Sequence, residues 1–94
     1  ERLGQHFIHG LGHHLGLDTH DAVKTNGEFD KLKPGNIITV EPGIYIAKGI
    51  DAPKKYHGIG VRIEDDILVT KNRCENLTSA LFKEVRDIEK YMTH

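Results

Sequence analysis

The chain has 94 residues, 37% of them hydrophobic and 29% charged, which is typical of a single small globular domain rather than a disordered or membrane protein. Thirteen Lys and Arg balance fourteen Asp and Glu, so no net field favours nucleic acid or an anionic bilayer as a partner. No apolar run approaches the roughly 18 residues of a membrane span.

The first twenty residues are rich in glycine, which disfavours a regular helix. We expect Gln5–His9 to be extended and a loop with a short turn to follow it. The glycines do not have the spacing of a dinucleotide-binding fingerprint, so that function is excluded. They are Gly4, Gly10, Gly12 and Gly16.

The middle of the chain predicts strands. Asn26–Gly35 has the Gly, Asp and Pro content of a surface connection. Asn36–Glu41 is rich in β-branched residues and predicts a strand, and Ile44–Ala47 predicts another beyond the Pro42-Gly43 break. A polar, basic loop is expected over Lys48–His57.

Two further strands and a helix are predicted in the last third. Gly60–Glu64 and Ile67–Thr70 have strand composition, and we expect Asp65-Asp66 to separate them. Lys83–Met92 predicts an amphipathic helix, because its apolar residues recur at helical spacing. Those residues are Val85, Ile88, Tyr91 and Met92.

Cys74 is the lone cysteine, which excludes an internal disulfide and favours a reducing, cytoplasmic location. No signal-peptide pattern is visible. The sequence opens at Glu1 without an initiator methionine, so we expect a fragment of a longer protein.

Two glutamates lie in apolar strand sequence, where a lone carboxylate is costly to bury. Glu41 ends the run IITV, and Glu64 lies within VRIEDDILV. Each therefore needs a cationic partner. Arg62, two residues before Glu64 and so on the same face of a strand, is one candidate, and a metal ion is the other.

The segment HGLGHHLGLDTHD, residues 9–21, gathers His9, His13, His14 and His20. The His9 to His13 spacing matches that of the two-histidine helix of zinc proteases. However, Gly10 stands where that motif has glutamate, and the glycines disfavour a helix. Spacing alone therefore leaves open whether these histidines bind a metal or are exposed and hydrogen-bonded.

Three stretches, in this order and at these separations, resemble the Xaa-Pro aminopeptidase (aminopeptidase P) family, whose relatives include prolidase and methionine aminopeptidase. They are HGLGHHLGLDTHD, TVEPGIYI at 39–46, and GIGVRIEDDILVT at 58–70 with ENLT at 75–78. The resemblance implies an α+β pita-bread fold with a mostly antiparallel curved sheet and a C-terminal helix. It also implies that residues 1–94 form the C-terminal portion of a catalytic domain whose N-terminal half is absent.

The resemblance also implies a site with two divalent metal ions. Carried over residue by residue, His13 and Glu41 ligate one metal, Glu64 bridges both, and Arg62 supports a ligand carboxylate. His9 and His20 would contact substrate or move protons, and Glu41 would also relay protons. His6 and His14 match no functional position and are expected to be surface or packing residues.

The implied reaction is hydrolysis of the bond before a proline at the second position of a peptide. Oxygen-rich ligands with one imidazole suit manganese best, with zinc, cobalt and iron also compatible. The family takes two further aspartate ligands from the absent half, so we expect the chain alone to be inactive. The exposed face left by that half would favour a homodimer.

Two other hypotheses stay open. The chain could be a non-catalytic peptide- or protein-binding module on the same scaffold, or a stand-alone histidine-cluster metal carrier. Retention of the glutamate and histidine positions favours the enzyme. A carrier that used only His6–His20 would keep its metal after Glu41→Ala and Glu64→Ala.

Overall fold

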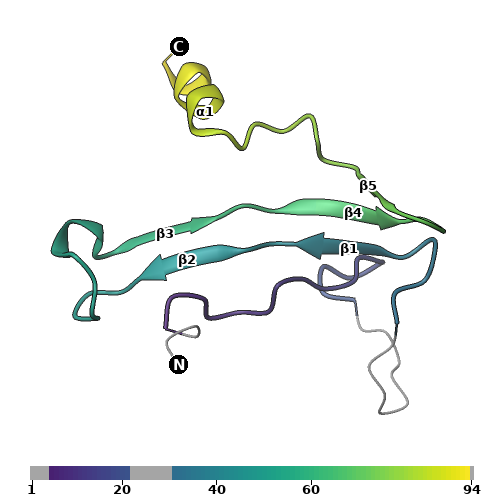
Figure 1. Ribbon diagram of the computed structural model, residues 1–94, viewed down its shortest axis with the longest axis horizontal. Coiled ribbons are helices and arrows are strands. Elements are labelled where there is room, and N and C mark those ends of the chain that lie inside the picture. Colours follow the sequence, from purple (N-terminus) through teal and green to yellow (C-terminus); the bar gives the residue numbers. More distant parts are fainter. Residues whose placement is uncertain (1–4, 22–30, 94) are drawn as a thin grey trace.

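The computed structural model describes residues 5–21 and 31–93, which form short antiparallel strands and one C-terminal α-helix (Figure 1). A 3-10 turn at Lys54–Tyr56 lies between the second and third strands. The strands are β1 (Ile37–Val40), β2 (Gly43–Ile46), β3 (Ile59–Arg62), β4 (Asp65–Val69) and β5 (Cys74–Asn76), and the helix is α1 (Val85–Met92).

The strands form two antiparallel pairs that follow one another in a single long ribbon. β1 pairs with β4, and β2 pairs with β3. Figure 1 shows β2 and β1 in one line and β3 and β4 in the line beside it. β5 adds to the far side of β4. The two pairs keep one register across the break between them, and this register positions the site described below.

The N-terminal segment, residues 5–21, runs along the free edge of β1 and β2. It is not a regular strand, because its backbone bends at residues 5, 6 and 9, so the extended conformation predicted for Gln5–His9 is only partly present. Its main chain nevertheless pairs with both strands. The bonds are Leu15 N to Ile37 O at 3.1 Å, Thr39 N to His13 O at 2.8 Å, Glu41 N to Leu11 O at 2.7 Å and Tyr45 N to His6 O at 2.8 Å.

The predicted strands and helix are present, with shifted ends. The prediction that Asp65-Asp66 separates two strands is wrong, because both residues begin β4. β5 was not predicted, and the helix begins at Val85 rather than Lys83. The first part of the predicted connection Asn26–Gly35 lies outside the described residues. Its last five residues are exposed and turn at Pro34-Gly35.

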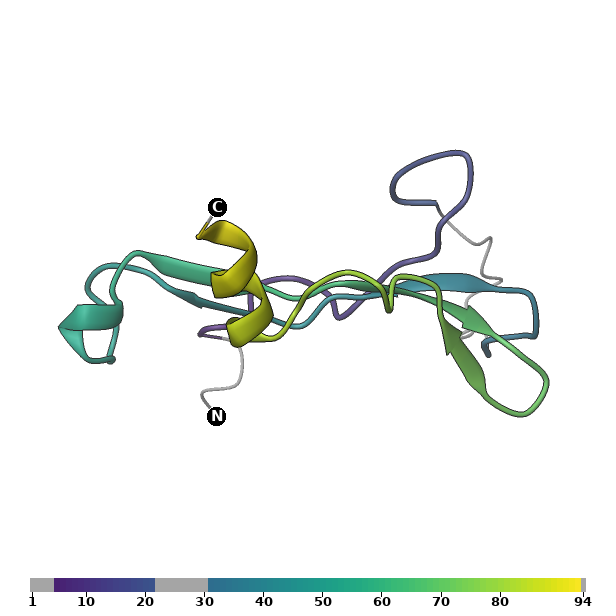
Figure 2. The ribbon, with the colours of Figure 1, turned by 90° about the horizontal axis from the view of Figure 1, so that it is seen from above.

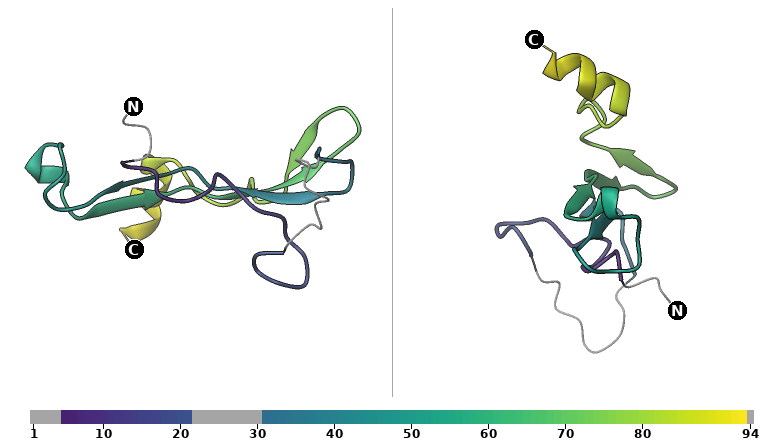
Figure 3. Two further views of the ribbon diagram at one scale, coloured as in Figure 1. Left: turned by 90° about the horizontal axis from the view of Figure 1, so that it is seen from below. Right: turned by 90° about the vertical axis from the view of Figure 1, so that its left-hand side faces the viewer.

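The ribbon is thin and has no apolar interior of its own. Among the residues described, no hydrophobic side chain is buried. The radius of gyration is 16.7 Å, against about 12 Å for a compact chain of this length. Figure 2 shows the ribbon edge-on, and the right-hand view of Figure 3 shows α1 standing away from the strands. No helix in the described part of the chain is long and apolar enough to cross a membrane.

Candidate metal centre

The site lies at the break between the two strand pairs, where Glu41 follows β1 and Glu64 precedes β4. Val40 pairs with Asp65 and Gly43 with Arg62 in the same register, so Glu41 comes opposite Glu64. The hydrogen bond from Ile63 N to Pro42 O, 3.1 Å, joins the two segments between the strand pairs. Opposite residues of an antiparallel pair project on the same face, so both carboxylates point the same way.

Alternation along the strands puts further polar side chains on this face, which we call the polar face. Like charges directly opposite each other destabilise a sheet. Glu41 is nearly buried, with 11% of its side chain exposed, so its charge has little access to water. The two carboxylates therefore need positive charge near them. The polar face consists of Thr39, Glu41, Tyr45, Arg62, Glu64 and Asp66, which is opposite Thr39.

His13 reaches the polar face from the N-terminal segment. Its backbone N–H donates to the Thr39 hydroxyl at 3.0 Å, and its carbonyl accepts from Thr39 N. The approach is close because Gly12 has no side chain. A Cβ at Gly12 would lie 1.9 Å from the Thr39 carbonyl oxygen, so the glycine is what allows this segment to lie against β1.

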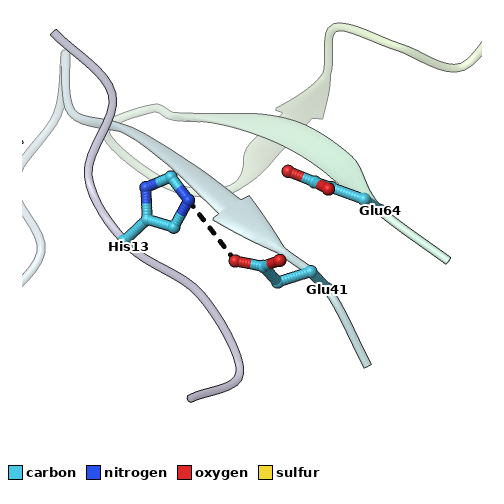
Figure 4. Close-up of side chains that lie close together, drawn as sticks. All are labelled: His13, Glu41 and Glu64. Carbon is cyan, nitrogen blue, oxygen red and sulfur yellow. Dashed lines mark ion pairs between the residues drawn. The ribbon is translucent and has the colours of Figure 1, made fainter. Parts of the chain in front are cut away.

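His13, Glu41 and Glu64 form one cluster, shown in Figure 4. A ligand-type atom of each lies within 4.8 Å of those of the other two. The predicted ligands are therefore brought together from three separate stretches of the chain. Glu64 is the exposed member of the three.

The tautomer of His13 follows from its contacts. Its Nδ1 lies 3.0 Å from the carbonyl oxygen of His14, which only accepts, so Nδ1 carries the proton. In the neutral ring, Nε2 then presents its lone pair to Glu41 Oε1, 3.4 Å away. Two lone pairs facing each other are stabilised by a cation between them or by a second proton on the ring.

Arg62, on β3, compensates the negative charge of Glu41, which lies just after β1. Its Nη1 lies 3.7 Å from Glu41 Oε2, so the ion pair forms with Glu41 rather than with Glu64, the partner expected from their shared strand face. Its Nε donates to the Tyr45 hydroxyl at 2.8 Å. That hydrogen bond, with the charges of Tyr45, Glu41 and Glu64, raises the pKa of Arg62 above its ordinary value.

Tyr45 was not singled out from the sequence, although it links two predicted site residues. Its hydroxyl lies 2.7 Å from His9 Nε2 and accepts from Arg62. Hydrogen bonds therefore link His9 through Tyr45 to Arg62, and an ion pair links Arg62 to Glu41. Tyr45 lies four residues after Glu41, on the same strand face, and this spacing was the signal available in the sequence.

His20 lies edge-on to His13, with ring centroids 4.6 Å apart. Its side chain is exposed. His6 and His14, expected to be surface or packing residues, are half-buried and outside the three-residue cluster. His14 forms backbone bridges with Asp21 and Ile38.

The sequence was compared with known families and proteins. A family model described as metallopeptidase family M24 matches residues 1–71. The chain belongs to metallopeptidase family M24. Within it, the Xaa-Pro aminopeptidase of Escherichia coli strain K12 is 48% identical over 87 residues, which are 92% of this chain and 20% of that protein.

Solved structures agree with this assignment. Aminopeptidase P from E. coli with the inhibitor Pro-Leu matches with a TM-score of 0.85 and 48% identity, over 96% of this chain and 21% of that one. A zinc-substituted form of the same enzyme in complex with product matches with the same TM-score, 0.85. This M24 chain therefore has the predicted pita-bread fold, and it spans about a fifth of the length of these relatives.

Proposed function

We propose that this chain forms part of the active site of an Xaa-Pro aminopeptidase, which cleaves the bond before a proline at the second position of a peptide. The observation that carries the proposal is the convergence of His13, Glu41 and Glu64 within 4.8 Å. Membership of family M24 and the similarity to Xaa-Pro aminopeptidases support it.

The residues present fit a divalent metal centre. The lone pair of His13 Nε2 faces a carboxylate oxygen, and two carboxylates come opposite each other on one face. His13 and Glu41 would hold one ion and Glu64 would bridge to a second. When bound, such ions lower the pKa of water and polarise a peptide carbonyl. Carboxylate-rich ligands favour manganese, and zinc, cobalt or iron would also fit.

The residues of this chain have separate tasks in the proposed reaction. The ion pair with Arg62 orients the Glu41 carboxylate. Glu41 can accept a proton from the attacking water as a general base. His9, fixed by the Tyr45 hydroxyl, and His20, exposed beside His13, donate protons or contact the peptide. The prolyl nitrogen has no hydrogen, so proline must be recognised by packing of its ring.

The three ligands fill only part of a two-metal site. As the resemblance to the aminopeptidase P family implies, we propose that two aspartate ligands come from the N-terminal half of the catalytic domain, outside this sequence. On this basis the 94 residues alone bind metal weakly and are inactive. The lone Cys74 supports a reducing compartment, and we place the enzyme in the cytoplasm.

A non-catalytic peptide-binding module on the same scaffold is the alternative. Such a module does not need metal ligands. Here all three candidate ligands are present and converge, and Arg62 is paired with one of them. The geometry therefore favours the enzyme.

A chimera tests the proposal. The matching fifth of the E. coli Xaa-Pro aminopeptidase is replaced by this chain, and hydrolysis of an Xaa-Pro peptide is measured with added manganese. We expect an active chimera, no activity from the 94 residues alone, and at least a hundredfold loss in the chimera with Glu41→Gln. The same loss with Glu75→Gln, an exposed glutamate in β5, would indicate a general charge effect. A folded chimera without activity would refute the proposal.

A further inference from the structure

We infer that Thr39 is a positioning residue, whose hydroxyl sets His13 and Glu41 in their ligating arrangement before any metal binds. The inference rests on the proposed metal centre, which it deepens. Thr39 itself would touch neither metal nor peptide. It would act through the two side chains that do.

Burial is the first observation. Thr39 is 2% exposed, and it is the most buried side chain in the described part of the chain, where no hydrophobic residue is buried. A buried hydroxyl is costly unless its hydrogen-bonding capacity is used. Here the hydroxyl donates one hydrogen bond and accepts one, and both partners belong to the site.

The hydroxyl joins two separate parts of the chain. It accepts from His13 N at 3.0 Å, so it ties the N-terminal segment to β1. It donates to Glu41 Oε1 at 3.2 Å, two residues along its own strand. Oε1 is also the oxygen that faces His13 Nε2 at 3.4 Å. One small group therefore orients both ligands toward the same point.

The direction of the proton follows from these partners. A backbone N–H can only donate, so it occupies a lone pair of the hydroxyl oxygen. The single hydroxyl proton is then directed to Glu41, which must accept as a carboxylate. Oε2, on the other side of that carboxylate, forms an ion pair with Arg62 at 3.7 Å. Both oxygens are thus oriented independently of any metal.

Two substitutions separate the hydroxyl from the shape of the side chain. Thr39→Val keeps the β-branched shape favoured in a strand but removes the hydroxyl. Thr39→Ser keeps the hydroxyl and removes a methyl group. A role in packing predicts that Ser is the worse replacement, whereas a positioning role predicts that Val is.

The test measures manganese affinity by titration calorimetry in the natural full-length polypeptide. We expect Thr39→Val to weaken manganese binding about 10- to 100-fold, the usual effect of removing a group that orients a metal ligand, and Thr39→Ser to stay close to the parent. If Thr39→Val does not fold, Thr39→Ala replaces it, with the same expectation. Thr70→Val is the control, because its hydroxyl serves a turn with Arg73.

A metal-free crystal structure of Thr39→Val adds a readout that is independent of activity. We expect the Glu41 carboxylate to turn away from His13 Nε2. Unchanged geometry, or parental manganese affinity in the variant that lacks the hydroxyl, overturns the inference. A parent that binds manganese and cleaves no Xaa-Pro peptide refutes the proposed function alone, and a parent that binds no manganese overturns both.

Discussion

At the scale of single residues, the Tyr45 ring depends on the glycines around it. Tyr45 pairs with Gly60 on the neighbouring strand and lies two residues from Gly43 on its own. A Cβ at Gly60 would be 2.8 Å from the Tyr45 ring, and one at Gly43 would be 2.7 Å from it. The ring therefore lies flat over two positions without side chains, which brings its hydroxyl to His9 and Arg62.

We predict that Tyr45→Phe lowers kcat/KM for an Xaa-Pro peptide about tenfold, because it removes a hydrogen bond to a charged group and releases His9. The ring remains, so the thermal midpoint should change little. Steady-state kinetics and thermal denaturation of the full-length polypeptide measure both effects. Tyr56→Phe, at an exposed tyrosine in the 3-10 turn, is the matched control. An equal loss in both variants would contradict the prediction.

The sequence was informative about the cluster and about Arg62, and it did not identify Thr39 or Tyr45 as supporting residues. His13, Glu41 and Glu64 were identified from motifs, and the structure brings them together, although their metal-binding role stays a prediction. Thr39 and Tyr45 were missed because their importance depends on the register between strands and on the approach of the N-terminal segment. Thr and Tyr are ordinary strand residues, so the spacing of Tyr45 from Glu41 on one strand face was the only local sign for it.

At the scale of elements, the wrong prediction of a break between strands at Asp65-Asp66 arose because both residues are acidic. Asp is disfavoured in strands, so Asp65-Asp66 were expected to interrupt one. Their partners explain why they do not. Lys83 Nζ lies 2.8 Å from Asp65 Oδ1, and the Thr78 hydroxyl donates to Asp65 and accepts from Asp66 N. These partners lie more than ten residues away, beyond the reach of local patterns.

The Lys83 contact leads to a prediction about stability in acid. Hydrogen bonds from Lys83 and then from Thr78 lower the pKa of Asp65 below its ordinary value of 3.8. Because the pKa of Asp65 is lower in the folded than in the unfolded state, its ionised carboxylate increases the free energy of unfolding at pH values above 3.8. This contribution is lost as the pH falls from 3.8 through the pKa of the folded state. Lys83→Met should therefore lower the thermal midpoint at neutral pH, and the difference from the parent should shrink below pH 3.8.

Thermal denaturation across this acid range checks the prediction. Lys90→Met, on the exposed surface of α1, controls for the loss of one positive charge. A gap between parent and Lys83→Met that stays constant down to low pH would show that Asp65 is not the partner that matters.

At the scale of the whole molecule, the described residues form a ribbon without a core. Large apolar side chains are exposed on both the strands and the helix, and burial of such side chains is the main stabilising contribution in folding. The sequence predicted a single small globular domain from its length and composition. It could not predict that the core would be absent from the described residues, because this depends on how the strands and helix are arranged in space.

The apolar residues around α1 make self-association of the isolated 94 residues the expected behaviour. They line one pocket and include side chains that are exposed to water. Self-association would remove this apolar surface from water. We predict concentration-dependent association in sedimentation velocity experiments, reduced by Leu81→Glu with Met92→Glu. Ala47→Glu with Asn72→Glu adds the same two negative charges at exposed positions outside α1 and should change association less. Monomers at every concentration would contradict the predicted homodimer. The lining residues are Ala80, Leu81, Phe82, Ile88, Tyr91 and Met92.

The shared register of the two strand pairs also determines where this chain can tolerate insertions and deletions. Removing one residue between Arg62 and Asp65 would turn Glu64 to the opposite side of the ribbon, because successive side chains alternate. The excursion over residues 47–58, between β2 and β3, carries no such constraint, since both strands are held by their own ladder. Homologous chains should therefore differ in length in this excursion and keep a fixed length between β3 and β4.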